Sequence, residues 1–209
     1  MSFSIKKFFE KVAGERAPGP APTFSVLHLM RTLELVAEKP IGRSKLAQEL
    51  KIGEGAVRTI INRLKSKGLL STSKAGCFLT DKGLKLYEEY RRIFGGEVVI
   101  VKDKLIPANY NFALLVKNCG HKIKSGMEQR DAAVKMGAEG AAAMVFKNGR
   151  LVIPSASDDA SKDFPSLTEQ LIKLLKPEEN DAIIIGGAES LDLARYGAMA
   201  AAWTLLGNC

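Results

Sequence analysis

The side chains best suited to recognition chemistry in this 209-residue chain are Arg58 and Asn62, four positions apart. In a helix, that spacing puts both on one face. Arg can bond through two atoms to guanine in the DNA major groove, and Asn can do the same to adenine. The apolar residues around them recur at i, i+3, i+4 and i+7 and form the other face: Val57, Ile60, Ile61 and Leu64. The pattern predicts a helix over residues 55–67 that buries one side and offers the other to DNA.

The neighbouring segments predict the elements that would position this helix. Residues 41–50 read as a shorter helix and residues 51–53 as a turn, with Gly53 at the sharp bend because glycine adopts positive φ without steric cost. Residues 69–73 and 77–79 read as two strands around a three-residue loop, 74–76. The segment therefore predicts a winged helix-turn-helix.

In such a unit the polar and basic side chains of both helices and of the hairpin are the candidate DNA contacts. They are Arg43, Ser44, Lys45, Arg58, Thr59, Asn62, Arg63, Ser66 and Lys74. Arg58 and Asn62 are the expected base readers. Lys74, at the hairpin tip, is expected to lie near a phosphate and to add affinity rather than sequence choice.

Charge is divided unevenly along the chain. Up to Phe94 there are 18 Lys and Arg against 9 Asp and Glu, and after it 13 against 14, so the whole-chain charge of +8 resides in the first half. Such segregation is expected when one domain meets a polyanion and the other does not. The alternative is that charged helix residues are merely a solvated face, and that the winged helix docks on proteins.

The sequence predicts an α+β chain in three parts. Residues 1–22 hold a short amphipathic helix and a Pro-rich linker, and the helix must dock on something because so short a helix is unstable alone. Residues 23–94 form the winged helix-turn-helix domain, with Thr80 capping a connector helix. Residues 95–209 alternate strand and helix signals, with an Asn148-Gly149 hairpin turn. They predict a two-layer α/β domain with a mixed sheet, for effector binding or dimerisation.

Two clusters in the second domain are candidate ligand sites. One is Glu128 and Asp131, spaced i, i+3 on one helix, with Arg130 between them; an exposed face with local ion pairs is the plainer interpretation. The other is Gly186, Gly187 and Glu189, read as a loop between a strand and a helix N-terminus that could hold an anion. Neither cluster has a nucleophile with a recognisable base beside it, so no catalytic residues are assigned.

Cysteine and histidine counts argue against a disulfide framework and a structural metal site. Cys77, Cys119 and Cys209 form no CxxC pair, and His28 and His121 are the two histidines of the sequence. We therefore predict unpaired thiols and no metal or cofactor; the sequence also contains neither a GxGxxG nor a GxxxxGK motif. No run approaches the ~20 apolar residues of a spanning helix, so we expect a cytoplasmic protein.

Several of these motifs together resemble an archaeal family of winged-helix proteins with a C-terminal domain of unknown function. They are residues 53–59, the wing closing at 78–83, residues 128–135, and the strand 182–185 followed by Ala188-Glu189. The resemblance covers roughly residues 24–206 and leaves the N-terminal extension outside. It implies a transcriptional regulator, with no established ligand or enzymatic activity to carry over.

The sequence thus favours a transcriptional regulator that binds double-stranded DNA and is not an enzyme. A homodimer is expected because one winged helix covers only a short site, whereas two related by symmetry read a longer one. A small-molecule effector could bind the second domain. Two alternatives stay open: an enzyme or small-molecule-binding protein whose winged helix docks on proteins, and an assembly protein that docks on transcription machinery without reading bases.

Overall fold

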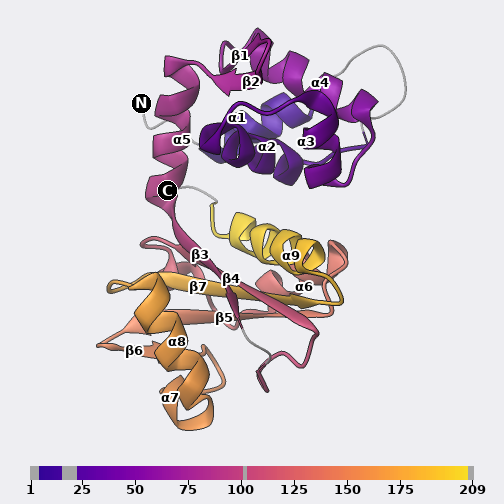
Figure 1. Ribbon diagram of the computed structural model, residues 1–209. Helices are drawn as coiled ribbons and strands as arrows, with labels where there is room; N and C mark the ends of the chain where they lie inside the picture. The colour runs from indigo at the N-terminus through magenta and orange to yellow at the C-terminus, as the bar shows by residue number, and fades with distance from the viewer. Residues whose placement is uncertain (1–4, 16–22, 101–102, 207–209) are drawn as a thin grey trace. The chain divides into compact units, whose positions relative to one another are not determined.

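The computed structural model describes residues 5–15, 23–100 and 103–206, in two compact units, residues 1–90 and 91–209 (Figure 1). The predicted Pro-rich linker lies outside the described residues, and so does Cys209. The chain is of mixed α+β class: the first unit is largely helical, and the second is built on a five-stranded sheet.

The first unit consists of six elements and most of a seventh, which crosses the unit boundary. They are α1 (Ile5–Ala13), α2 (Val26–Glu38), α3 (Arg43–Leu50), α4 (Glu54–Ser66), β1 (Leu70–Ser73), β2 (Gly76–Leu79) and α5 (Asp81–Ile93). The first four helices supply most of its fully buried apolar side chains, including Phe9, Leu29, Met30, Leu33, Leu46, Leu50, Ile60 and Leu64. The amphipathic N-terminal helix, α1, therefore docks within its own unit, against α2.

The connections around α4 differ in one point from the sequence expectation. Gly53 has φ −64° and precedes α4 in extended conformation, so the expected positive φ there is wrong. Lys51 takes the left-handed conformation instead, with φ 56°, and ends α3. At the other end of α4 the expected stop is present: Gly68 has φ 71°, and its N–H donates to the Lys65 carbonyl at 2.8 Å.

The hairpin β1–β2 is fastened to the chain segment that precedes α3. Its turn has two residues, Lys74 and Ala75, rather than the expected three, because Ser73 pairs with Gly76. Ile41 and Cys77 exchange backbone hydrogen bonds of 3.1 and 2.9 Å and form a one-residue bridge. Gly76 permits this approach: its φ is +125°, and a Cβ there would lie 2.5 Å from the Ile41 carbonyl carbon.

The second unit contains the ten remaining elements. They are β3 (Phe94–Ile100), β4 (Tyr110–Val116), η1 (Gly120–Lys122), α6 (Met127–Lys135), β5 (Gly140–Lys147), β6 (Arg150–Val152), α7 (Ala160–Asp163), α8 (Pro165–Leu175), β7 (Ala182–Ala188) and α9 (Leu191–Thr204). The strands stand in the order β3-β4-β7-β5-β6.

Every neighbouring pair in this sheet is antiparallel, so the expected mixed sheet is wrong. The expectation came from the local order strand, helix, strand over β4, α6 and β5, which favours parallel neighbours. Those two strands do run in the same direction, but β7 lies between them and runs antiparallel to both.

Helices cover both faces of the sheet, so the unit has three layers rather than the expected two (Figure 1). On one face, Ala113, Leu115, Ile183 and Ile185 pack in a core with residues of α7 and α8. The alternate residues point to the other face, where Arg195 of α9 lies over the Phe112 ring and α6 packs beside α9.

Candidate nucleic-acid interface

The exposed face of α4 carries Arg58, Asn62 and Lys65 in one row. The three occupy positions i, i+4 and i+7, and all are exposed, whereas Val57, Ile60, Ile61 and Leu64 are buried. Lys65 was missing from the sequence-based set. Its spacing from Asn62 and Arg58 is the signal that could have found it.

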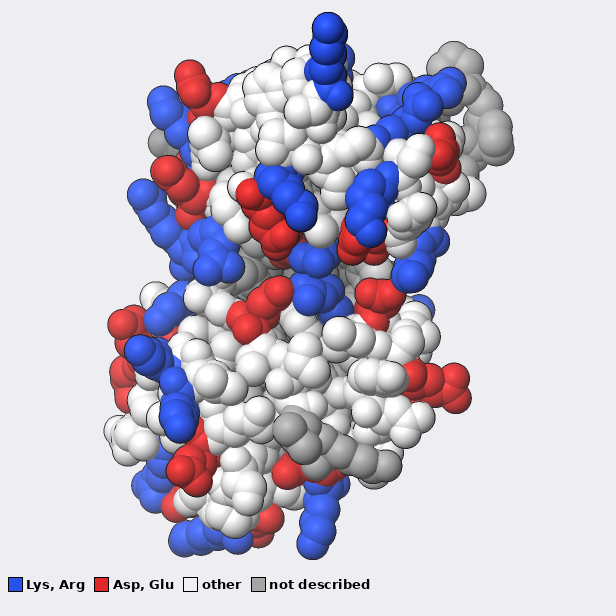
Figure 2. All heavy atoms as spheres, in the orientation of Figure 1, with Lys and Arg blue, Asp and Glu red and all other residues white. Residues whose placement is uncertain are grey.

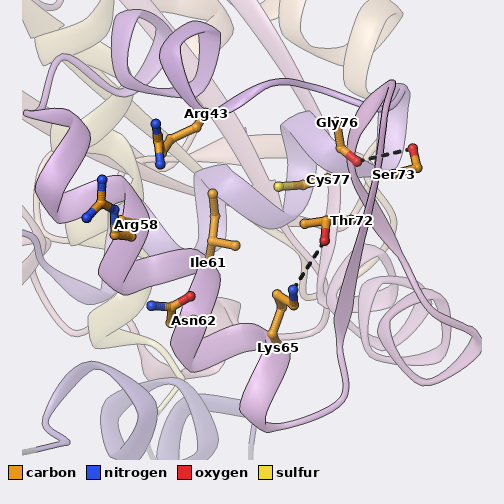
Figure 3. Close-up of a pocket in the computed structure, with 9 residues that line it drawn as sticks. All are labelled: Arg43, Arg58, Ile61, Asn62, Lys65, Thr72, Ser73, Gly76 and Cys77. Atoms are coloured by element: carbon orange, nitrogen blue, oxygen red, sulfur yellow. Dashed lines mark hydrogen bonds between the residues drawn. The ribbon is translucent and has the colours of Figure 1, made fainter.

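This row borders a hollow of about 290 Å³ between α4 and the hairpin (Figure 3). Arg43, at the start of α3, lies on its rim near Arg58. The Lys65 ammonium donates to Thr72 Oγ1 at 3.2 Å and so links α4 to β1. The hollow is lined by Arg43, Arg58, Ile61, Asn62, Lys65, Thr72, Ser73, Gly76 and Cys77. It therefore combines groups from both helices of the pair and from the hairpin.

The floor of the hollow is uncharged. Cys77 and Cys119 are both buried, and neither is joined by a disulfide. Burial raises the pKa of the Cys77 thiol above its ordinary value, and the nearby Lys65 opposes this only in part. The thiol thus stays protonated at neutral pH, and the cationic groups stand around a neutral floor.

The three candidate residues at the start of α3 are exposed. Arg43 pairs with Glu54 at 3.4 Å, and both side chains are about half exposed, at 45% and 51%. Lys45 pairs with Glu49 at 2.9 Å one turn along the helix. Exposed pairs of this kind contribute only about 0 to 1 kcal/mol, so these cations can exchange their partners for a phosphate. Ser44, between them, is exposed at the first turn.

The two hydroxyl candidates of α4 are bonded to their own helix. Thr59 Oγ1 donates to the Gly55 carbonyl at 3.1 Å, and Ser66 Oγ donates to the Arg63 carbonyl at 2.8 Å. Lys74 lies in the two-residue turn of the hairpin and is exposed. It thus occupies the tip of the hairpin, at the place expected from the sequence.

Arg63 does not belong to this surface, contrary to the sequence expectation. It is 7% exposed and donates to the carbonyls of Val12 and Ala13, at 3.0 and 2.6 Å, and to that of Glu15. Its guanidinium carbon lies 5.2 Å from the centre of the Phe24 ring. Arg63 thus caps the C-terminal end of α1, where its positive charge meets the carbonyl end of the helix dipole.

Charge on the visible face of the first unit is mixed. Figure 2 shows blue Lys and Arg among red Asp and Glu in the part that carries α1 to α5 in Figure 1. The cationic excess of this half of the sequence therefore does not form one unbroken patch on that face.

The first candidate ligand cluster of the second unit does not enclose a site. Glu128, Arg130 and Asp131 are all exposed on α6. The plainer interpretation, an exposed helix face, describes them.

The second candidate cluster is not the expected loop, because β7 extends to Ala188 and includes both glycines. A Cβ at Gly186 would lie 2.4 Å from the Ala194 carbonyl oxygen of α9, and one at Gly187 would lie 2.3 Å from the Ile106 side chain. These glycines serve close packing rather than anion binding. Glu189 follows the strand and is exposed.

The described residues offer neither a metal-binding cluster nor a membrane-spanning helix. They contain no group of three or more His, Cys, Asp and Glu placed to hold a metal ion. None of the helices in the described ranges is long and apolar enough to cross a membrane.

Comparisons with known proteins separate the same two parts of the chain. Residues 27–85 match the family described as PH0730-like, N-terminal domain, and residues 106–205 match a domain of unknown function, DUF4443. Among curated proteins, none matches this sequence. The solved structure of the hypothetical protein PH0730 from Pyrococcus horikoshii OT3 has 28% sequence identity, with a TM-score of 0.72 over 87% of this chain and 92% of that one. The chain is thus similar along most of its length to an archaeal protein, with one part like a PH0730-like N-terminal domain and the other like the DUF4443 domain.

Proposed function

We propose that this protein is a DNA-binding transcriptional regulator whose first unit is a winged helix-turn-helix. The observation that carries the proposal is the exposed row of Arg58, Asn62 and Lys65 on α4, next to a hairpin with Lys74 at its tip. An amide and two cations in one row suit a helix that enters the major groove, because bases offer paired acceptors and donors there.

The remaining contacts follow from the arrangement of the elements. With α4 in the groove, Arg43 and Ser44 at the start of α3 would lie along the sugar-phosphate backbone, where cations and hydroxyls fix the register of the protein. The hairpin would lie beside the groove as the wing. Its fastening to Ile41 supports this role, because the bridge holds the wing in a fixed place relative to α3.

The first test is a gel shift at low salt, with unrelated duplex DNA and then with the DNA upstream of the protein's own gene. We expect binding to both and a preference for the second. Arg58→Ala should reduce affinity for the preferred site by about 1 to 3 kcal/mol and relax the choice at one base pair. The matched control is Arg150→Ala, which removes the same charge from an exposed position at the start of β6 in the second unit and should leave the affinity for DNA unchanged. Absence of binding by the wild-type chain would overturn the proposal.

A second substitution separates base reading from phosphate contact. Lys74→Ala should weaken binding to all duplexes alike and reduce the slope of log affinity against log salt by about one unit. The measurement is fluorescence anisotropy of a labelled duplex over a series of salt concentrations. A loss confined to one sequence would contradict the phosphate role of Lys74.

A further inference from the structure

The outer face of α6 carries a stripe of four residues, Met127, Arg130, Asp131 and Val134, spaced i, i+3, i+4 and i+7. We call this set the α6 stripe. All four are exposed, and the two apolar ones strongly so: Met127 is 63% exposed and Val134 45%. Exposed apolar side chains on one helix face are candidates for contact with a partner where they belong to a continuous surface.

The opposite face of α6 is already occupied by α9. Gln129 Nε2 donates to Thr204 Oγ1 at 2.7 Å, and a Cβ at Gly197 would lie 2.6 Å from that of Ala138. Gln129 and Ala133 are buried there. Packing within the unit therefore explains the inner face and leaves the α6 stripe outside it.

Leu193 of α9 extends the apolar part of this surface. It is 39% exposed, and its Cδ2 lies 3.4 Å from where a Cβ at Gly137 would stand, just beyond the end of α6. The surface thus runs from Met127 along α6 to Val134 and Leu193, with one cation and one anion at its centre.

The order of residue types along the α6 stripe is self-complementary. Read along the helix it is apolar, basic, acidic, apolar. If two copies of α6 meet antiparallel about a two-fold axis midway between Arg130 and Asp131, Met127 faces the partner's Val134 and Arg130 faces the partner's Asp131. A parallel alignment in the same register would instead set each charge against its own kind, which is unfavourable. A two-fold contact is also the commonest way for identical chains to associate.

We infer that the α6 stripe is the surface through which two copies of this protein associate. The inference stands apart from DNA binding, because it rests on residues of the second unit alone. One helix pair covers less area than the roughly 1,200 to 2,000 Å² of a typical stable interface, so the dissociation constant is expected in the micromolar range.

The test is sedimentation equilibrium of the full-length protein from about 1 to 200 µM, the range that brackets such an affinity. The wild type should pass from monomer to dimer. Arg130→Asp and Asp131→Arg should each weaken association about tenfold or more, because symmetry doubles every like-charge contact. The control Arg150→Asp makes the same change outside the surface and should leave the association constant unaltered.

Two combinations of these substitutions make the test specific. The double substitution Arg130→Asp with Asp131→Arg exchanges the charges and should restore association, and an equimolar mixture of the two single variants should form heterodimers. A misfolded chain could not be rescued in this way. The inference is overturned if the wild type stays monomeric at about 200 µM, if the single reversals do not weaken association, or if either combination fails to recover it.

Discussion

Arg63 ties two helices together that are far apart in sequence. Its three hydrogen bonds go to the carbonyls at the end of α1, and Phe24 covers one side of the guanidinium. The apolar residues Ile5, Phe9 and Val12 complete the buried contact of α1. The N-terminal helix is therefore a structural part of the unit that carries α4.

Arg63→Ala should lower the free energy of unfolding by about 2 to 4 kcal/mol, because the carbonyls at the end of α1 would lose their charged donor and a buried space would open. Urea denaturation followed by circular dichroism measures it. Arg58→Ala, on the same helix but exposed, is the matched control and should stay within about 0.5 kcal/mol of the wild type. Equal effects of the two substitutions on the free energy of unfolding would contradict the structural role assigned to Arg63.

His28 makes stability depend on pH. Burial lowers the pKa of its imidazole below the ordinary value of about 6.5, and its Nδ1 accepts the Ser25 N–H at 3.0 Å. The folded protein thus resists protonation more than the unfolded chain does. Stability should be at its full value above about pH 6.5 and decline as the pH falls below it, because the unfolded state then binds the proton first. Denaturation midpoints between pH 8 and 5, compared for wild type and His28→Gln, should show a flatter curve for the variant, and parallel curves would contradict this origin.

At the scale of elements, helical periodicity predicted the helix α4 well, but it predicted less well which side chains belong to its exposed face. A helix advances about 100° per residue, so Arg58, Asn62 and Lys65 fall within about 60° of one another, whereas Arg63 lies about 140° round from Arg58. The sequence therefore held the reason to include Lys65 and to doubt Arg63. The sequence did not indicate the position of α1, which covers the side of α4 that carries Arg63.

Gly76→Ala should destabilise the hairpin by about 2 kcal/mol or more, because the new Cβ would meet the Ile41 backbone at 2.5 Å and φ +125° is strained for alanine. Gly55→Ala is the matched control. Gly55 lies in the first turn of α4 with nothing within 4 Å of its Cβ position, so alanine should stabilise by about 0.5 to 1 kcal/mol. Thermal unfolding of both variants gives the two signs, and changes of the same sign would refute the argument.

For the whole molecule, the α+β class followed from the sequence, but the direction and order of the strands in the sheet did not. Alternating apolar residues and the Asn148-Gly149 turn identify strands locally. The place of β7 between β4 and β5 depends on pairings over long sequence separation, such as those of Gly186 with Phe112 and with Ala141. Likewise, the uneven charge shows that the first half is the basic one, which is why we propose it as the DNA-binding part, but it does not indicate which cations face inward.

The two proposals together make a prediction for the full-length protein. If the α6 stripe joins two copies and each first unit reads one half-site, Arg130→Asp should weaken binding to a duplex with two half-sites about tenfold or more. Affinity for a single half-site should be unchanged. Anisotropy titrations with both duplexes measure the pair of constants. Equal losses on both would show that Arg130 acts on DNA directly and not through association.

If the first unit binds DNA as proposed, the bridge between Ile41 and Cys77, which Gly76 makes possible, affects the entropy change of that binding. A hairpin anchored at its base is already ordered before any duplex arrives. Binding to DNA would then not have to immobilise the hairpin backbone, so the conformational entropy lost by the hairpin would come mainly from side chains such as Lys74. The backbone geometry at Gly76 would in this way increase the affinity contributed by Lys74 at the tip of the hairpin.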